Sequence, residues 1–410
     1  MNITDQQIIS ATGVAVVGFA GFGGFCEGFK QATGTSPLVA VNHWPAAIKL
    51  HTINHPETRH FIEDVFAVDL RAAIGNERVW WCHISPDCTH FSRAKGAVPR
   101  DQKIRGLAWV LVEWARITGA DIISLENVAE FLSWGDLDEN GRPIAEQEGK
   151  EFLRFVSALR DLGYVVEWRE LCAADFGAPT IRRRLFLVGR RDGAPICWPA
   201  PTHGPGLLPY RTAAECIDWS VPAPSIFSRR KPLVEATCRR LAAGVMRFAR
   251  PVGGAPHALA FLAKHYTGVI GQTLAKPMGT ITAVDHHALC TATTGPADHL
   301  GARRVVSFLT SYYSGGGTAT SLDQPMPTIV ATARHGLVCC TMDGQAIIDL
   351  GMRMLTPREL ARGQGFSDDY QLTGTIAEQI RCIGNSVCPA VAAALVRANT
   401  VMSPAQRAVA

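Results

Sequence analysis

Two short segments carry side chains that could act together in covalent catalysis. The first places Cys88 just after residues 79–84, an uncharged run typical of a buried strand. The second places Glu126 and Asn127 at the end of a similar, almost uncharged run at 120–125. A cysteine thiolate is a strong nucleophile, and a nearby carboxyl group can serve as a general acid. Together the segments predict thiolate attack on an electrophilic ring.

The elements that must position these side chains alternate along the first half of the chain. Strands are expected at 14–17, 38–41, 79–84, 122–125, 164–168 and 185–189, and helices at 106–118 and 149–162. This alternation predicts a Rossmann-like α/β fold, a mostly parallel sheet with helices on both faces. Ligands of such sheets bind at the carboxyl ends of the strands, where Cys88 and Glu126 would emerge.

Each of these residues also has a purely structural explanation. Cys88 alone could be a buried, inert thiol, the commoner role of cysteine. Glu126 and Asn127 could cap the helix that follows them. Pro86 and the pair Phe91-Ser92 around the cysteine, together with the order of the two segments, favour catalysis.

Composition excludes several classes of protein. The length of 410 residues predicts two domains, or one domain with a large insertion. Twelve cysteines without a CxxC pair argue against a disulfide scaffold or a zinc ribbon and suit a reducing cytoplasm, so no metal is expected. Five glycines interrupt the uncharged stretch 11–26, which excludes a signal peptide or a membrane span there.

A second, smaller and β-rich domain is expected after residue 195, where proline and glycine become frequent. Residues 274–281 match residues 322–329, and His287 recurs as His335 at the same 48-residue offset. We interpret the match as a duplicated β-rich unit, at about 265–290 and 311–340.

Positive charge is concentrated although the net charge is only +4. Residues 229–250 contain one acidic residue, Glu235, and seven basic residues: Arg229, Arg230, Lys231, Arg239, Arg240, Arg247 and Arg250. A second cluster follows Cys88: Arg93, Lys95, Arg100, Lys103 and Arg105. Basic clusters beside a catalytic loop predict a phosphate-rich partner. The alternative for 229–250 is a solvated helix face.

Six motifs in this order resemble those of the cytosine-5 DNA methyltransferases of bacteria and phages. They are Phe19-Ala20-Gly21-Phe22-Gly23-Gly24, Pro86-Asp87-Cys88, Glu126-Asn127-Val128, the arginine segment 177–184, the segment 353–366 and Gly384-Asn385-Ser386-Val387-Cys388-Pro389. Any one of these motifs is unspecific, but their shared order is highly specific.

The resemblance implies methyl transfer from S-adenosylmethionine to C5 of a cytosine flipped out of double-stranded DNA. Cys88 would bond to C6 of the base, and Glu126, its pKa raised by burial, would contact N3 and the exocyclic amine. Asn127 would hold the loop. Arg182 and Arg184, two residues apart on one strand face, would contact the base carbonyl, the catalytic acid or a phosphate.

The resemblance also implies which residues contact the cofactor and DNA. Cofactor contacts are expected from Phe19, Gly21, Gly23, Gly24, Asn42, His43, Trp44, Asp64, Val65, Pro86, Asn385, Ser386 and Val387. DNA contacts are expected from Ser92, Arg93, Lys95, Arg229, Arg230, Lys231, Arg239 and Arg240. Asn42 and Trp44 stand where the family usually carries acids, although Trp44 could stack on adenine.

The expected organisation is a catalytic and cofactor-binding domain at 1–195, completed by a C-terminal helix at 380–402, and a target-recognition domain at 196–379. The protein is expected to be a cytoplasmic monomer of a bacterial or phage-infected cell, without a membrane partner. A cognate restriction endonuclease is a candidate partner. Two alternatives stay open: a catalytically inactive DNA-binding relative, suggested by the altered acidic positions, and an RNA cytosine-5 methyltransferase.

Overall fold

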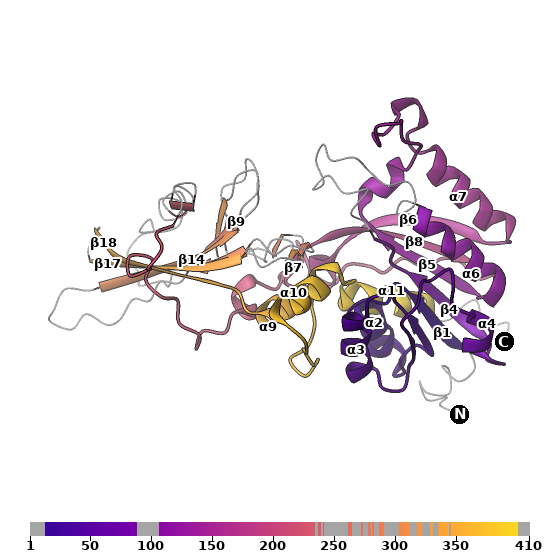
Figure 1. Cartoon of the computed structure of the whole chain (residues 1–410), viewed down its shortest axis with the longest axis horizontal. Helices are drawn as coiled ribbons and strands as arrows, with labels where there is room; N and C mark the ends of the chain where they lie inside the picture. The colour runs from indigo at the N-terminus through magenta and orange to yellow at the C-terminus, as the bar shows by residue number, and fades with distance from the viewer. Residues whose placement is uncertain are drawn as a thin grey trace. The chain divides into compact units, whose positions relative to one another are not determined.

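The computed structural model describes residues 13–87, 106–233, 237–238, 241 and 351–400, and the backbone of the strands between 261 and 350. Six predicted site residues lie outside the described residues: Cys88, Ser92, Arg93, Lys95, Arg239 and Arg240. The chain forms two compact units (Figure 1). Unit 1 comprises Met1–Cys172, Arg183–Ala200 and Val387–Ala410, and unit 2 comprises Ala173–Arg182 and Pro201–Ser386.

Unit 1 is built on a seven-stranded sheet in the order β3-β2-β1-β4-β5-β8-β6. Its strands are β1 (Val14–Gly18), β2 (Val39–Val41), β3 (Arg59–Phe61), β4 (Val79–Ile84), β5 (Ile122–Asn127), β6 (Val165–Cys172) and β8 (Arg183–Arg190). The first five are mutually parallel, whereas β8 runs antiparallel to both β5 and β6. The predicted Rossmann-like, mostly parallel sheet is therefore confirmed.

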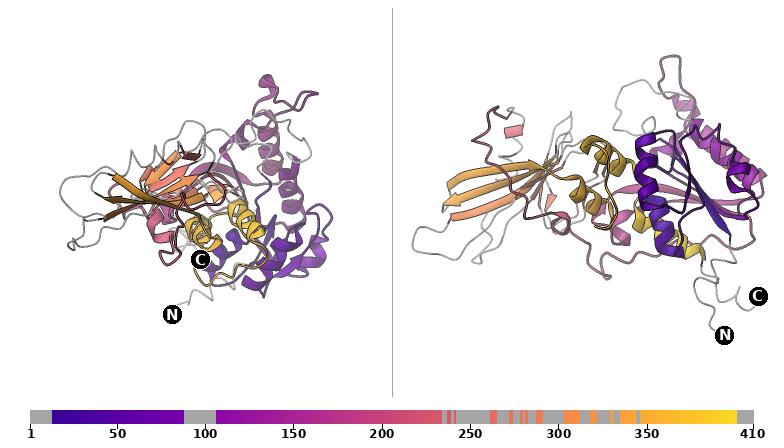
Figure 2. Two further views of the ribbon diagram at one scale, coloured as in Figure 1. Left: turned by 60° about the vertical axis from the view of Figure 1, so that its left-hand side comes forward. Right: turned by 60° about the horizontal axis from the view of Figure 1, so that its bottom comes forward.

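Helices cover both faces of this sheet (Figure 2). They are α2 (Gly24–Thr33), α3 (Pro45–Asn54), α4 (Leu70–Ile74), α6 (Val110–Thr118), α7 (Lys150–Asp161) and α11 (Pro389–Thr400), with 3-10 turns η2 (Gly106–Trp109), η3 (Ala129–Ser133) and η4 (Ala145–Gln147). Helices α4, α6 and α7 share one apolar core with the sheet. On the other face, Phe25 of α2 stacks on His83 of β4 with ring centroids 3.6 Å apart.

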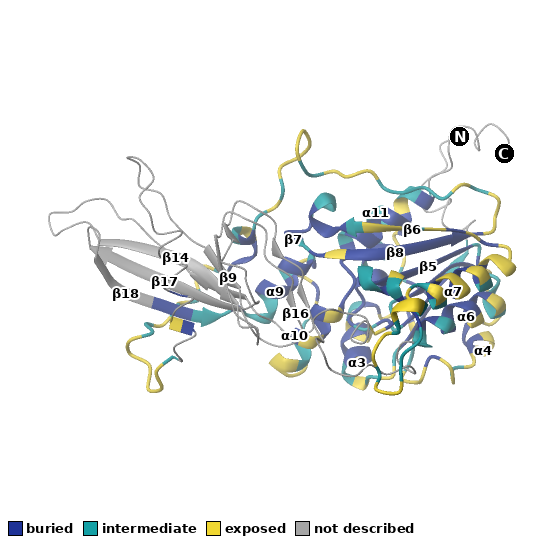
Figure 3. Ribbon diagram, turned by 90° about the horizontal axis from the view of Figure 1, so that it is seen from above, coloured by how far each residue is buried: buried dark blue, intermediate teal, exposed yellow. Residues whose placement is uncertain are grey.

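The expected strands are all present, but their bounds differ from the expected ones, and the sheet contains an additional strand, β3. Strand β5 continues two residues further than expected and includes Glu126 and Asn127. Strand β3 has only three residues, all exposed or half-buried, so its composition carries no strand pattern. Figure 3 shows β5 and β8 buried over almost their whole length.

Unit 2 contains a second seven-stranded sheet in the order β10-β9-β13-β18-β17-β14-β15. The strands of the unit are β7 (Thr180–Ile181), β9 (Phe261–Lys264), β10 (Gln272–Thr273), β11 (Met278–Gly279), β12 (Ile281–Thr282), β13 (His287–Cys290), β14 (Arg303–Ser311), β15 (Thr318–Ser321), β16 (Ile329–Val330), β17 (His335–Asp343) and β18 (Ala346–Met354). The short turn η5 (Ala173–Phe176) precedes β7, and η6 (Ala213–Cys216) precedes β9.

The two copies of the repeated sequence supply strands on either side of β18. Ala288 of β13 and Gly336 of β17, which are 48 residues apart, both pair with Met354. The copies also pair directly, because β12 and β16 form a parallel pair in which Ile281 lies opposite Ile329. Residues at the same position of the repeat therefore occupy matching registers in the unit 2 backbone.

Two helices follow the second sheet, α9 (Pro357–Gln364) and α10 (Ile376–Asn385). Each begins at a capping box, Thr356 with Glu359 and Thr375 with Glu378, whose paired hydrogen bonds satisfy backbone amides at the helix start. The stretch Ile376–Thr400, which comprises α10 and α11, is long and apolar enough to span a membrane, but 72% of its most apolar window is buried in the fold. Burial of this kind is typical of core helices.

Candidate active site

The carboxyl ends of β1, β4 and β5 lie side by side and are tied together by hydrogen bonds. The Ser85 amide donates to Gly18 O at 3.4 Å, which joins the chain after β4 to the end of β1. The Asn127 amide nitrogen Nδ2 donates to Pro86 O at 3.3 Å, which joins the same chain to the end of β5. Strand order reverses between β1 and β4, and ligands of open α/β sheets bind at such a point.

A buried ion pair stands at this edge of the sheet. Arg184 Nε lies 3.3 Å from Glu126 Oε1, and both side chains are about nine-tenths buried. Glu126 lies opposite Phe186 in the β5–β8 ladder, so Arg184 is its diagonal neighbour, within reach of a long side chain. The antiparallel direction of β8 brings the first residues of that strand to the last residues of β5.

The other two arginines of the motif have different surroundings. Arg183 is exposed and pairs with Glu170 of β6 at 3.4 Å. Arg182 lies between β7 and β8, is 3% exposed, and donates from Nη1 to Gly384 O at 3.0 Å. Arg182 thus contacts the last turn of α10, within unit 2.

A polar cluster that the sequence analysis missed is buried beneath this edge. Trp81 Nε1 donates to Ser124 Oγ at 2.7 Å, and His83 Nδ1 lies 2.8 Å from the same oxygen. Burial lowers the pKa of His83 to about 3, so the imidazole is neutral at physiological pH. The cluster joins β4 to β5 immediately before the predicted nucleophile loop.

The turn after β1 has the backbone of a ligand cradle. Phe19 has φ 55°, a left-handed value that is uncommon for a side chain other than glycine and is typical of functional sites. Gly21 and Gly23 also have positive φ, at 53° and 90°. Helix α2 then begins at Gly24, and its N-cap residue Gly23 provides no side-chain hydrogen bond to the first amides. Because amides at a helix start attract anions, this turn fits the carboxylate of an amino-acid moiety such as that of S-adenosylmethionine.

Among the residues after β2, Asn42 makes a hydrogen bond within its own loop. Asn42 Oδ1 accepts a hydrogen bond from the Trp44 amide at 2.9 Å and so shapes the entry to α3. His43 is exposed, and Trp44 is half-buried. An acid at position 42 could offer both oxygens to ribose hydroxyls, whereas Asn42 has one oxygen, and that oxygen already accepts a bond.

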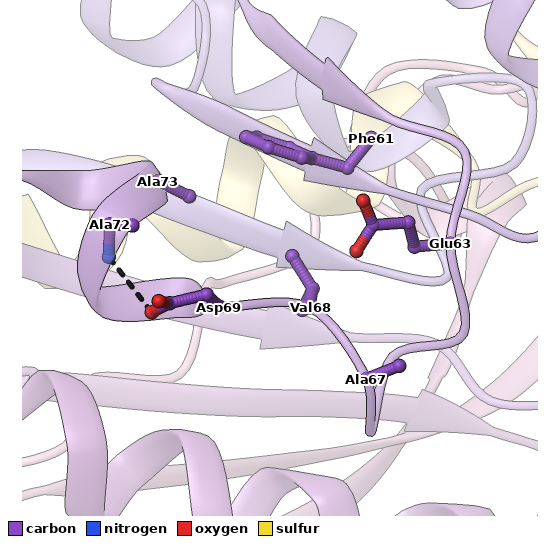
Figure 4. A pocket seen from close by; sticks show the side chains of 7 residues that line it. All are labelled: Phe61, Glu63, Ala67, Val68, Asp69, Ala72 and Ala73. Carbon is purple, nitrogen blue, oxygen red and sulfur yellow. Dashed lines mark hydrogen bonds between the residues drawn. The ribbon is translucent and has the colours of Figure 1, made fainter.

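The predicted adenine contacts lie in the loop after β3. Asp64 Oδ1 accepts from the Phe66 amide at 2.9 Å, and Val65 is buried with its carbonyl bonded to Trp114. A surface pocket opens beside this loop (Figure 4). It is lined by other residues, Phe61, Glu63, Ala67, Val68, Asp69, Ala72 and Ala73. The pocket therefore contains none of the predicted cofactor contacts.

The last predicted cofactor segment follows α10. Asn385 is exposed, while Ser386 and Val387 are buried. Gln364 Nε2 donates to Ser386 O at 2.8 Å, so the segment is held within unit 2 by Gln364 as well as by Arg182 at Gly384. Gln364 was not among the predicted site residues, because a glutamine at a helix end carries no specific signal.

Of the predicted DNA contacts, three are described. Arg229, Arg230 and Lys231 are all exposed and lie in a non-helical segment. The alternative of a solvated helix face is therefore wrong for these three positions. Their contact with DNA stays a prediction.

Comparison with known proteins decides the family. A family profile described as C-5 cytosine-specific DNA methylase matches residues 18–205 and 303–400, which include all six motifs completely. The chain belongs to this family. Its members are S-adenosylmethionine-dependent methyltransferases, as the predicted resemblance implied.

Individual members of the family are similar over different parts of the chain. The Type II methyltransferase M.AquIA of Picosynechococcus sp. is 30% identical over 232 residues, 50% of this chain and 88% of that protein. The Type II methyltransferase M1.HphI of Haemophilus parahaemolyticus is 24% identical, covering 93% of this chain and 84% of that protein.

Solved structures share the fold of this methylase at low identity. A DNA modification methyltransferase encoded within an E. coli prophage has a TM-score of 0.54 with 18% identity, over 94% of this chain and 97% of that one. A DNMT2 variant of Spodoptera frugiperda has a TM-score of 0.52 with 17% identity, over 92% and 97% of the two chains. Likeness at this level identifies the fold.

Proposed function

We propose that this chain is a DNA (cytosine-5) methyltransferase that modifies C5 of a cytosine flipped out of duplex DNA, using S-adenosylmethionine. Membership of the family supports the reaction class. The observation that carries the assignment to this site is the buried Arg184–Glu126 ion pair. Glu126 lies on β5, which pairs with β4, the strand that leads to Cys88. Covalent activation of a ring needs a thiol nucleophile and a carboxyl group that both reach the base.

In the proposed reaction Cys88 supplies the electron pair that makes C5 nucleophilic. Its thiolate bonds to C6 while Glu126, held by Arg184, shares a proton with ring nitrogen N3. S-adenosylmethionine supplies an electrophilic methyl group when it is bound. After C5 has taken the methyl group, a base removes the C5 proton, and the C6–S bond breaks to release the thiolate.

We propose that the turn after β1 holds the cofactor through its backbone. The amides around Gly21, Gly23 and the start of α2 would donate to its carboxylate. Asn42 would donate from Nδ2 to the ribose, since its oxygen accepts from the Trp44 amide. Contacts from His43, Asp64, Val65, Pro86, Asn385, Ser386 and Val387 belong to the same proposal.

We further propose that residues 196–379 form the target-recognition domain and that 1–195 with 380–402 form the catalytic domain. The exposed Arg229, Arg230 and Lys231 support contact with phosphates. We propose a monomer that acts in the cytoplasm of a bacterial or phage-infected cell, with a cognate restriction endonuclease as candidate partner. Sedimentation of the purified chain with and without DNA tests the monomer.

Transfer of labelled methyl from S-adenosylmethionine to duplex DNA tests the proposed reaction. Cys88→Ser should abolish transfer, whereas Cys238→Ser, which removes an exposed thiol, should leave it unchanged. DNA containing 5-fluorocytosine should trap a covalent protein–DNA adduct, because fluorine cannot leave as a proton does. Methyl transfer without any trapped adduct contradicts the role of Cys88.

Asn42 Oδ1 already accepts a hydrogen bond from the Trp44 amide, which weakens its contact with a cofactor and favours the alternative of an inactive, DNA-binding relative. Titration calorimetry with S-adenosylmethionine distinguishes it: absence of binding, with DNA binding retained, favours the inactive relative. Tighter binding by Asn42→Asp would identify the amide as the weak contact. Parallel assays on DNA and RNA of the same sequence test the RNA alternative.

A further inference from the structure

The duplicated region reaches the arginine motif through one short strand. Strand β11, in the first copy, pairs in parallel with β7, so that Met278 lies opposite Thr180 and Gly279 opposite Ile181. Arg182 is the residue directly after β7. The first copy of the sequence repeat is therefore joined by a backbone ladder to the segment that carries Arg182. Both segments belong to unit 2.

Arg182 is held by its backbone as well as by its side chain. The Ala173 amide donates to Arg182 O at 2.8 Å, and the Arg182 amide donates to Thr180 Oγ1 at 3.3 Å. The guanidinium donates to Gly384 O, and both Arg182 and Thr180 are buried. A shift of β7 would therefore move Arg182.

The two copies of the repeat differ at one of the two residues of this pairing. The first copy reads Pro-Met-Gly-Thr-Ile and the second Pro-Met-Pro-Thr-Ile, so Pro327 stands at the position of Gly279. Proline has no amide hydrogen and cannot donate to a strand ladder. The second copy instead pairs with the first, through β16 and β12.

We propose that Met278 and Gly279 form a positioning strand for catalysis. Their pairing with β7 sets the position of Arg182, which directly follows that strand. The inference rests on the proposed function for its catalytic readout. It assigns different tasks to the two copies: the first copy aligns Arg182, and the second copy pairs with the first.

Proline substitutions test this assignment. Only one of two successive amides in a strand can point toward β7, so Met278→Pro and Gly279→Pro are made separately. At least one of them should lower the single-turnover rate of methyl transfer about tenfold or more, while the dissociation constant for DNA changes less than about threefold. The control Pro327→Gly, at the corresponding position of the second copy, should stay within about twofold of wild type.

A double-mutant cycle distinguishes positioning from general damage. In an Arg182→Lys background the effect of the proline on rate should shrink to within about threefold, because the group that it positions is already altered. Full retention of the effect overturns the proposal. Unchanged rates in both proline variants, or equal losses of rate and DNA affinity, overturn it as well.

Hydrogen exchange tests the ladder even if a proline variant does not fold. In the wild-type chain the amides of 180–181 and 278–279 should exchange at matching rates and slow together when DNA is added. Independent exchange of the two segments refutes the pairing. A wild-type chain with coupled exchange but no methyl transfer would refute the proposed function and leave the ladder intact.

Discussion

At the scale of single residues, two neighbouring pairs on β8 have opposite surroundings. Arg184 and Glu126 are buried, whereas Arg183 and Glu170 are exposed, with 63% and 41% of their side chains accessible. Alternation along the strand places adjacent arginines on opposite faces. An exposed ion pair contributes little to stability, while a buried one fixes the orientation of its carboxyl group.

Glu126→Gln should lower the rate of methyl transfer by about 10²- to 10⁴-fold, because an amide cannot share a proton with N3. The trapped adduct with 5-fluorocytosine DNA should fall in the same proportion. Glu170→Gln, which neutralises the exposed carboxyl group paired with Arg183, is the control and should leave the rate unchanged. Equal effects of the two substitutions would remove the special role of Glu126.

Buried histidines predict how stability depends on pH. Burial lowers the pKa of His55 to about 4 and of His83 to about 3, and that of His51, which lies 2.8 Å from His60, well below 6.5. Lys30 also lowers the pKa of His55, and Glu57 opposes that effect.

The sign follows from which state binds protons. In the unfolded chain these histidines titrate near their ordinary pKa of about 6.5, so below that pH the unfolded state binds more protons. Stability should be fully present above about pH 6.5 and should fall as pH decreases toward 4. Urea unfolding at pH 7.5, 6 and 5 measures it, and a flat free energy of unfolding over this range contradicts the prediction.

At the scale of elements, α2 and α11 approach so closely that Gly28 has no room for a side chain. An added Cβ would lie 2.5 Å from Pro389 O and 2.6 Å from Ala392 Cβ. Gly28→Ala should therefore destabilise the protein by about 1–3 kcal/mol through overpacking. Gly106→Ala is the control, since among the described residues no atom lies within 4 Å of a Cβ added there. Thermal unfolding that ranks the two variants equally would contradict the argument.

A second element depends on one fully buried carboxylate. Glu359 accepts hydrogen bonds from Nη1 and Nη2 of Arg353, both at 2.8 Å, and from the backbone amides of Asp218 and Thr356. The network joins the end of β18 to α9 and to the chain at 218.

Glu359→Gln should cost about 3–5 kcal/mol, because it leaves Arg353 buried without a counter-charge. Glu113→Gln breaks an exposed pair with Arg116 and should cost less than about 1 kcal/mol. Chemical denaturation of both variants measures the difference. A loss below about 1 kcal/mol for Glu359→Gln would show that the network is dispensable.

At the scale of the whole molecule, affinity for DNA depends on the placement of charge more than on the net charge of +4. Neutralising the exposed Arg229, Arg230 and Lys231 together should reduce the slope of log affinity against log salt by up to about 3. Removal of three other exposed charges, those of Lys49, Arg71 and Arg142, is the control. Equal slopes for both triple variants would exclude these arginines and this lysine from the DNA contact.

The amino-acid sequence alone determined the elements and the chemistry of this protein. Uncharged runs bounded by turns identify β1, β4 and most of β5, because strands buried on both faces are mainly apolar. Residues at or just after the carboxyl ends of these strands, including Glu126 at the end of β5, carry the reaction class, since a parallel sheet brings its carboxyl ends to one edge. The shared order of the six motifs indicates the family without any knowledge of the fold.

Tertiary structure alone decided which of these residues meet. The strand pattern at 185–189 does not encode direction, yet only an antiparallel β8 brings Arg184 to Glu126; a parallel one would carry it to the opposite edge. The Ser124 cluster, the Gly384 contact of Arg182 and the β7–β11 ladder join residues far apart in sequence. Such contacts depend on packing between elements, which local composition does not record.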